Sequence, residues 1–206
     1  MLYFICFAIL GYLLGGILFA PIFGKIFKKD VVGTSDDKNP GAANAFKNGG
    51  PLCGGLTLAC DVLKGLVPVA ICLSNNKCED LLTNQIGTAL VLLAPVLGHM
   101  FPVYRHFKGG KGIAVTFGVL LGYLPYIYPV LILAIFFILF SVVIVVKPDF
   151  YKTLLVYFCV SVTFLIKSPF PGLRLGFILI SIFVFLRFHL SKEKREKIEV
   201  KFLWKH

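Results

Sequence analysis

The feature that most constrains this chain is a series of long apolar stretches that follow one another closely along the sequence. The first, MLYFICFAILGYLLGGILFA, contains no charged residue. A helix needs about 20 apolar residues to cross the roughly 30 Å of hydrocarbon in a bilayer. Composition agrees, because 58% of the residues are hydrophobic and 15% are charged, against about 45–50% and 25% in soluble domains. We therefore predict an all-α integral membrane protein.

About seven transmembrane helices are predicted within a single polytopic membrane domain, residues 1–206. The expected spans are 2–23, 51–73, 81–97, 113–128, 129–146, 153–166 and 174–188. The fourth and fifth spans are separated only by the stretch YLPYIYP, and the sixth is short. The residues that follow the last span, 189–206, are expected to form a basic cytoplasmic tail.

The distribution of lysine and arginine orients these spans. With the N-terminus outside, the inside segments hold the basic tail and Lys25, Lys28, Lys29, Lys38, Lys47, Arg105, Lys108, Lys111, Lys147 and Lys152. The predicted outside loops hold Lys77, Lys167 and Arg174. Because cytoplasmic loops are enriched in these residues, we predict an outside N-terminus and a cytoplasmic C-terminus. The enrichment of cytoplasmic segments in lysine and arginine accounts for the net charge of +11. A nucleic-acid partner is therefore not expected.

This orientation places two glycine-rich segments on the same face of the membrane. The second, GHMFPVYRHFKGGKG, contains Gly109, Gly110 and Gly112. Glycine allows successive backbone N–H groups to turn inward and form an anion-binding nest. The helix expected to begin near Ile113 would add its own N–H groups and the positive end of its dipole. These features predict a phosphate-binding loop at the membrane surface.

Three side chains of the same segment support this interpretation. Lys108 and Lys111 supply positive charge, and His99 can donate a hydrogen bond or transfer a proton near neutral pH. The alternative is a basic loop that contacts anionic lipid headgroups. Headgroup attraction does not require glycine, so the glycine content favours the phosphate site.

The first segment, DDKNPGAANAFKNGGP, is interpreted as a second anion site. Asn39 is expected to cap a helix whose first residue is Pro40. Gly41 is small enough for close backbone approach, and Asn44 and Lys47 lie three residues apart on one helical face. The alternative is an ordinary capped surface helix without a ligand.

The second predicted span contains LACDVLKG, which places Asp61 and Lys64 on one helical face. Ionisable groups inside a bilayer are costly and usually face the interior of the bundle. A self-neutralising pair that supports helix packing is the favoured interpretation, and a direct chemical role is the alternative.

Three stretches together carry a family resemblance. NPGAANAFKNGG, LACDVLKG and GHMFPVYRHFKGGKGIAV resemble the motifs of the bacterial acyl-phosphate:glycerol-3-phosphate acyltransferases, the PlsY family. The resemblance implies transfer of a fatty acyl group from acyl phosphate to glycerol 3-phosphate. The products would be 1-acylglycerol 3-phosphate (lysophosphatidic acid) and phosphate, in phospholipid biosynthesis.

The resemblance also implies a location, partners and a site. The enzyme would span the bacterial cell (cytoplasmic) membrane many times, with its active site facing the cytoplasm. Its expected protein partner is the enzyme that forms acyl phosphate. It would require no metal, coenzyme A, acyl carrier protein or other cofactor. The implied catalytic residues are His99, Lys108 and Lys111. The implied substrate-binding residues are Asp37, Lys38, Asn39, Gly41, Asn44, Lys47, Gly109, Gly110 and Gly112. His99 would assist proton transfer, unless a phosphate group of the substrates serves as the base.

The first motif departs from the family pattern G-S-G-N-P-G-A-T-N-x-x-R. Asp37 stands at the serine position, Lys38 at the following glycine, Ala43 at the threonine and Lys47 at the arginine. Asp37 therefore puts a negative charge where a phosphate ligand is expected, and Lys38 is expected to compensate it.

The third motif of the family, H-x-x-N-I-x-R-L, is also altered. His189 and Arg195 keep the spacing, but Lys192 replaces the asparagine. The chain is therefore expected to be a divergent member. Three alternatives stay open: a paralogue with another phosphorylated acceptor, an anion or phosphate-solute transporter, and an inactive protein that binds acyl phosphate or a partner enzyme.

Overall fold

A computed structural model describes residues 1–35, 37–76, 79–190 and 197–203 of the chain. Its α-helices are α1 (Leu2–Gly15), α2 (Phe19–Ile26), α3 (Ala42–Gly49), α4 (Pro51–Ser74), α5 (Leu81–Met100), α6 (Ile113–Leu121), α7 (Tyr128–Ile138), α8 (Asp149–Lys167) and α9 (Pro171–His189). The remaining elements are the 3₁₀ turn η1 (Val103–Arg105), the π-helical segment η2 (Leu139–Val143), and the strands β1 (Ile144–Lys147) and β2 (Glu199–Phe202). The prediction of a mainly helical protein is confirmed, with a small sheet that was not predicted.

Within the described residues, 5 helical segments are long and apolar enough to cross a membrane. They are Leu2–Ile26, Pro51–Ser74, Leu81–Arg105, Asp149–Lys167 and Pro171–His189. The predicted fourth and fifth spans are shorter than expected. Helix α6 has 9 residues, which corresponds to about 14 Å. It ends before the proline-containing stretch YLPYIYP, and proline removes an N–H that a continuing helix needs.

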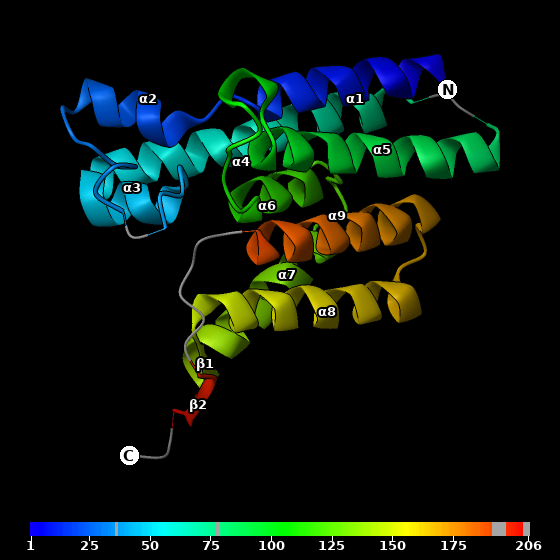
Figure 1. The fold of residues 1–206 in the computed structure, drawn as a ribbon. Coiled ribbons are helices and arrows are strands. Elements are labelled where there is room, and N and C mark those ends of the chain that lie inside the picture. The colour runs from blue at the N-terminus through cyan, green and yellow to red at the C-terminus, as the bar shows by residue number, and fades with distance from the viewer. Residues whose placement is uncertain (36, 77–78, 191–196, 204–206) are drawn as a thin grey trace.

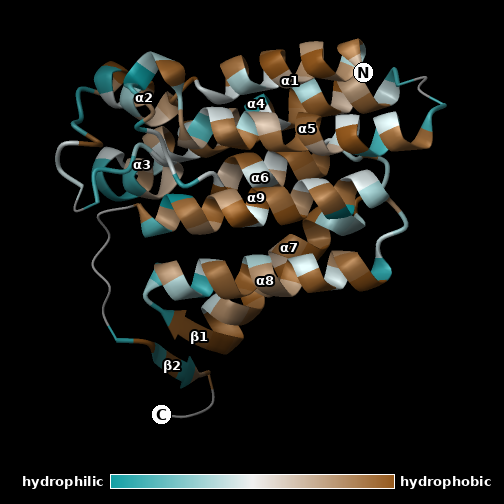
Figure 2. Ribbon diagram, turned by 45° about the vertical axis from the view of Figure 1, so that its right-hand side comes forward, coloured by the Kyte–Doolittle hydropathy of each residue, from teal (hydrophilic) through white to brown (hydrophobic). Residues whose placement is uncertain are grey.

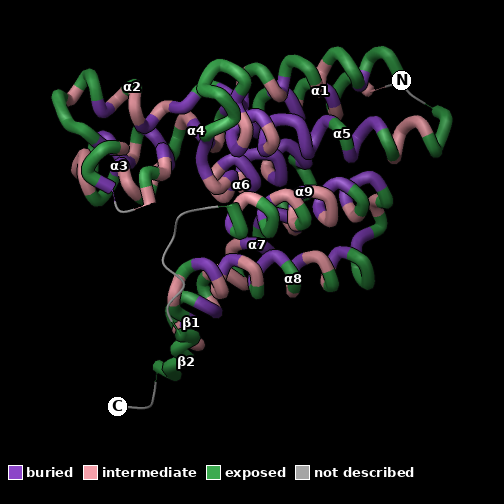
Figure 3. The backbone as a smooth tube through the Cα atoms, viewed as in Figure 1, coloured by how far each residue is buried: buried purple, intermediate pink, exposed green. Residues whose placement is uncertain are grey.

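Helix α5 forms the centre of the bundle and packs between α1 and α9, while α4 packs against α6 and α3 (Figure 1). Buried residues concentrate where these helices meet (Figure 3). A side chain at Gly98 would collide with the carbonyl of Tyr12, and one at Gly118 with the carbonyl of Val62. These glycines therefore allow the backbones of α5 and α6 to approach their neighbours closely.

The long helices of the bundle are mostly apolar along their length, and polar residues gather around α2, α3 and the loops (Figure 2). Large apolar side chains such as Ile71, Ile135 and Phe158 point outward and are exposed. An apolar surface of this extent would associate in water but matches lipid.

The predicted fifth span ends as a strand rather than a helix. Strand β1 pairs with β2 in an antiparallel sheet whose register joins Ile144 to Phe202 and Lys147 to Glu199. Part of the predicted basic tail, strand β2, is therefore paired. Its partner is strand β1, which directly follows η2. The central part of that tail, 191–196, lies outside the described residues.

Candidate active site

A cavity of about 980 Å³ lies between α3, α4, α5, α6, α7, α8 and α9, and residues of both glycine-rich segments line it. Its polar wall contains Asp37, Asn39, Asn44, Lys47, Asp61, His99, Lys111, Asp149, Lys152 and Thr153. Its other lining residues are Gly41, Ala42, Ala43, Phe46, Leu58, Gly112, Ile113, Ala114, Phe117, Phe137, Pro148 and Phe188. Residues far apart in the sequence thus meet at one site, as the two-loop prediction requires.

Asp37 organises the first segment at this cavity. Its Oδ1 accepts hydrogen bonds from Asn44 Nδ2 at 2.8 Å and from the Asn39 backbone N–H at 3.1 Å. Its Oδ2 lies 2.9 Å from Lys111 Nζ, and both side chains are 17% exposed. Lys38, which was expected to compensate Asp37, is exposed and does not line the cavity. The compensating charge therefore comes from the second segment.

These contacts determine the ionisation of Asp37. Burial raises the pKa of a carboxyl group, because a less polar environment disfavours the charged form. Hydrogen bonds from Asn44 and Lys111 and the charge of Lys111 outweigh burial, and the pKa of Asp37 lies below its usual value. Asp37 is consequently ionised at neutral pH.

The predicted cap at Asn39 is wrong. Helix α3 begins at Ala42 with Gly41 as its N-cap, and no side chain caps it. Asn39 instead accepts a hydrogen bond from Asn44 Nδ2 through its backbone oxygen, at 2.8 Å. Its side-chain Oδ1 is buried, and no described residue donates a hydrogen bond to it. A buried oxygen of this kind at a cavity wall is suited to a ligand that carries a donor.

The predicted anion nest at Gly109 and Gly110 is also corrected. Their N–H groups donate to Met100 O at 3.1 Å and His99 O at 2.9 Å, which satisfies the C-terminal carbonyls of α5. Gly112, with φ +83°, turns the chain into α6. Ile113 and Ala114, in the first turn of α6, line the cavity. The positive end of the α6 dipole, rather than the paired glycines, therefore faces the site.

The second glycine-rich segment is held from two sides. Arg187 of α9 donates from Nε to Gly110 O at 3.0 Å and from Nη2 to Gly109 O at 2.5 Å. On the other side, Tyr104 Oη donates to Leu13 O of α1 at 2.9 Å. The sequence prediction missed Arg187. Its signal was present, because a charged residue inside an apolar span usually has a specific partner.

The two lysines of this segment have different environments. Lys111 lines the cavity, and its Nζ lies 5.1 Å from the centre of the Phe188 ring. Lys108 is exposed and is not a cavity residue. Only Lys111 of the pair is therefore positioned for a ligand in the cavity. Lys47 of α3 lines the cavity, together with Asn44, as their helical spacing predicted.

His99, Asp61 and Lys64 form a buried cluster at the base of the cavity. Lys64 Nζ lies 2.7 Å from Asp61 Oδ1 and 2.9 Å from His99 Nδ1, and it donates to Ile17 O at 2.6 Å. The predicted pairing of Asp61 with Lys64 is confirmed. Asp61 and His99 also line the cavity, so the cluster is not confined to helix packing.

Apolar side chains complete the lining of the cavity. They include Phe117, Phe137 and Phe188, together with Leu58, which is 41% exposed. A cavity that is lined by cationic and amide groups together with aromatic rings would suit a ligand with an anionic head and a hydrocarbon tail.

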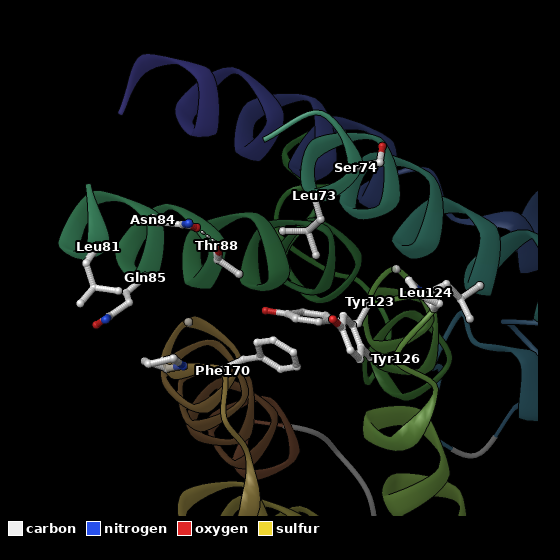
Figure 4. Close-up of a pocket in the computed structure, with 14 residues that line it drawn as sticks. Leu73, Ser74, Leu81, Asn84, Gln85, Thr88, Tyr123, Leu124, Tyr126 and Phe170 are labelled. Carbon is white, nitrogen blue, oxygen red and sulfur yellow. Dashed lines mark hydrogen bonds between the residues drawn. The ribbon is translucent and has the colours of Figure 1, made fainter. Parts of the chain in front are cut away.

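A second cavity, of about 540 Å³, lies at the opposite end of α4 (Figure 4). It is bordered by α5, the end of α6 and the start of α9, and Tyr123, Tyr126 and Phe170 face it. The described residues that line it carry no charge. It is therefore poorly suited to an anionic substrate.

The altered third motif is only partly described. His189 is the last residue of α9 and is not a cavity residue. Lys192 and Arg195 lie outside the described residues.

Comparison with known proteins identifies related sequences and structures. A family model described as glycerol-3-phosphate acyltransferase matches residues 5–195. Glycerol-3-phosphate acyltransferase of Aliivibrio salmonicida (strain LFI1238) is 40% identical over 112 residues, which cover 54% of this chain and 55% of the relative. The protein of the same name from Legionella pneumophila (strain Lens) is 38% identical over 123 residues, which cover 60% and 42%. The chain thus spans about half the length of the curated relatives it matches.

Two crystal structures of PlsY (YgiH), described as an integral membrane glycerol 3-phosphate acyltransferase, have a similar fold. The glycerol 3-phosphate form is 25% identical with a TM-score of 0.71, covering 90% of this chain and 88% of that one. The lysophosphatidic acid form is 25% identical with a TM-score of 0.67, covering 89% and 87%. The likeness extends over nearly the whole described bundle, and the chain is an integral membrane protein of many helices.

Proposed function

Because this chain belongs to the glycerol-3-phosphate acyltransferase family, we propose that it transfers a fatty acyl group from acyl phosphate to glycerol 3-phosphate. The products are 1-acylglycerol 3-phosphate and phosphate. The observation that carries this proposal is one cavity that is lined both by Lys111, Asn39 and Asn44 and by several phenylalanines. One substrate is an anionic amphiphile and the other a small phosphorylated polyol, and both match this cavity.

The reaction needs few protein groups. An acceptor hydroxyl oxygen bonds to the acyl carbon, and the bond from that carbon to the phosphate oxygen breaks with its electron pair remaining on phosphate. A phosphate oxygen takes up the hydroxyl proton. The chain contributes orientation of the two substrates and offsets their mutual repulsion. Lys47, Lys111 and the first turn of α6 supply the positive potential, and Phe117 and Phe137 contact the acyl tail.

The proposed location is the bacterial cell membrane, with the cavity facing the cytoplasm. The N-terminus lies outside and the C-terminus inside. The clustering of lysine on the cavity side of the bundle supports this orientation. The enzyme that forms acyl phosphate is the proposed protein partner, because its product is the donor.

Purified protein in lipid, supplied with palmitoyl phosphate and glycerol 3-phosphate, tests the proposal. Equal amounts of phosphate and lysophosphatidic acid are expected. If neither product forms, the proposal is contradicted and a binding or transport role is favoured. Uptake of a phosphorylated solute into vesicles without turnover would identify a transporter.

One observation favours a second candidate, a family member with a different phosphorylated acceptor. The family's serine is replaced by Asp37, and the carboxylate of Asp37 forms an ion pair with Lys111. Lys111 then contributes less charge to an anionic acceptor. For this candidate, we expect glycerol 3-phosphate to give phosphate release without lysophosphatidic acid. Another phosphorylated polyol should then accept the acyl group.

A further inference from the structure

The buried cluster at the base of the cavity constrains the chemistry of His99. Lys64 Nζ has three close polar neighbours: Ile17 O at 2.6 Å, Asp61 Oδ1 at 2.7 Å and His99 Nδ1 at 2.9 Å. A protonated lysine has three hydrogens and no acceptor. Two of the neighbours, a carbonyl oxygen and a carboxylate, can only accept. The arrangement matches a charged Lys64 that donates to Ile17 O and to His99 Nδ1 and forms an ion pair with Asp61.

This contact determines which nitrogen of His99 carries hydrogen. If Lys64 donates to Nδ1, then Nδ1 has no hydrogen and Nε2 must carry it in the neutral ring. A doubly protonated ring would direct its Nδ1–H at the lysine ammonium, which has nothing to accept it, and Asp61 Oδ1 is 3.7 Å from Nδ1, beyond hydrogen-bonding distance. His99 is 3% exposed, so bulk water does not replace Lys64 as the partner of Nδ1.

The other ring nitrogen is directed away from the cluster. None of the described residues forms a hydrogen bond with His99 Nε2. A side chain at Gly110 would collide with Nε2, so the absence of one lets this edge of the ring pack close to the Gly110 backbone. His99 lines the cavity. Nε2 is therefore the ring nitrogen that is left without a partner among the described residues and is available to a bound molecule.

We propose that Lys64 is a positioning residue that holds His99 as the neutral Nε2–H tautomer, so that His99 donates a hydrogen bond to a substrate oxygen. This inference rests on the proposed function for the identity of that oxygen, which is an oxygen of the acyl phosphate group. A donor at this point stabilises the negative charge that develops as the acceptor attacks. In this state the ring has no unoccupied nitrogen that could act as general base.

The tautomer can be observed without any substrate. The full chain, labelled with ¹⁵N-histidine and embedded in lipid nanodiscs, gives ¹⁵N signals that separate protonated from unprotonated ring nitrogens. His99→Gln identifies the His99 signals. The expected spectrum has Nδ1 unprotonated and Nε2 protonated. A protonated Nδ1 in the wild-type protein would overturn the inference, whether or not the protein is an acyltransferase.

The role of Lys64 is tested with a matched pair of variants. Lys64→Met is expected to introduce the Nδ1–H tautomer, whereas Lys108→Met, which removes an exposed lysine nearby, should leave the His99 signals unchanged. An unchanged His99 spectrum in folded Lys64→Met would refute the role of Lys64. If that variant does not fold, the wild-type spectrum alone decides the tautomer.

The donor role is tested by turnover. Glutamine presents an N–H near the position of Nε2, and asparagine presents one near Nδ1. His99→Gln should keep turnover within about tenfold of wild type, and His99→Asn should lose roughly 100-fold. Equal losses in both variants would exclude the donor role. Absence of turnover in the wild type would instead contradict the proposed function and leave the tautomer result standing.

Discussion

Lys111 Nζ lies 2.9 Å from Asp37 Oδ2, and this ion pair joins the two glycine-rich segments at the wall of the cavity. Each side chain is 17% exposed, so the pair is screened less than a surface ion pair. Asp37 stands where the family has serine, and its charge is balanced by Lys111 of the other segment rather than by its neighbour Lys38. The pair makes the position of the first segment dependent on the second.

Lys111→Ala is expected to lower kcat/KM by about 100- to 1,000-fold, because an oriented cation is lost at the phosphate position. Lys108→Ala is the control, since Lys108 is exposed and outside the cavity, and it should stay near wild type. Turnover with palmitoyl phosphate and glycerol 3-phosphate measures both. Equal effects of the two substitutions would contradict the assignment of the site to Lys111.

The Asp37 pair should depend on pH. The pKa of Asp37 lies below its usual value, about 3.9 for an unperturbed aspartate. Its contribution to stability is therefore present above that pH and is lost as the pH falls through the lowered pKa. The difference in Tm between wild type and Asp37→Asn should be constant near neutrality and narrow below about pH 4. If the advantage of the wild type in Tm increased as the pH fell, the anionic form of Asp37 would destabilise the fold.

Removing one member of the buried cluster should destabilise the fold. Asp61→Leu leaves the charge of Lys64 uncompensated inside the bundle, and a loss of about 3–5 kcal/mol is expected. The double variant Asp61→Leu, Lys64→Met removes both charges and should recover much of this loss. The loss of helical circular dichroism during thermal unfolding in mild detergent measures both. Additive losses in the double variant would show that the two residues do not act as a pair.

Arg187→Leu should loosen the second glycine-rich segment, because it removes two hydrogen bonds from a charged donor to Gly109 O and Gly110 O. The expected cost is about 1.5–3 kcal/mol for each bond. Hydrogen exchange at Gly109 and Gly110 should accelerate. Arg174→Leu is the control, because its Nε donates to Ser168 O at a distant loop. If hydrogen exchange at Gly109 and Gly110 is unchanged in Arg187→Leu, Arg187 does not hold this segment in place.

Gly110→Ala tests the close approach of the loop to His99. A methyl group there would collide with His99 Nε2, so turnover should fall by at least about tenfold while the protein stays folded. Gly55→Ala is the matched control, because a side chain at Gly55 meets nothing within 4 Å and alanine favours the α4 helix by roughly 0.5–1 kcal/mol. Normal turnover in Gly110→Ala would argue against a role for that edge of the ring.

The sequence determined the class of protein, its family and the two segments that form the cavity. Apolar stretches of membrane length have few alternatives to helices, and the family expected from the three motifs is confirmed by the match over residues 5–195. Spacing alone also placed Asn44 and Lys47 on one face, and Asp61 beside Lys64, because both relations are local to one helix.

Only the tertiary structure decided which groups of those segments meet. The choice of Lys111 rather than Lys38 as the partner of Asp37, and the use of the Gly109 and Gly110 N–H groups by α5, depend on how distant helices pack. The same is true of Arg187, which reaches the loop from α9. Side chains and N–H groups in a loop have several possible partners of similar energy, and the packing of the bundle determines which of them lies within hydrogen-bonding distance.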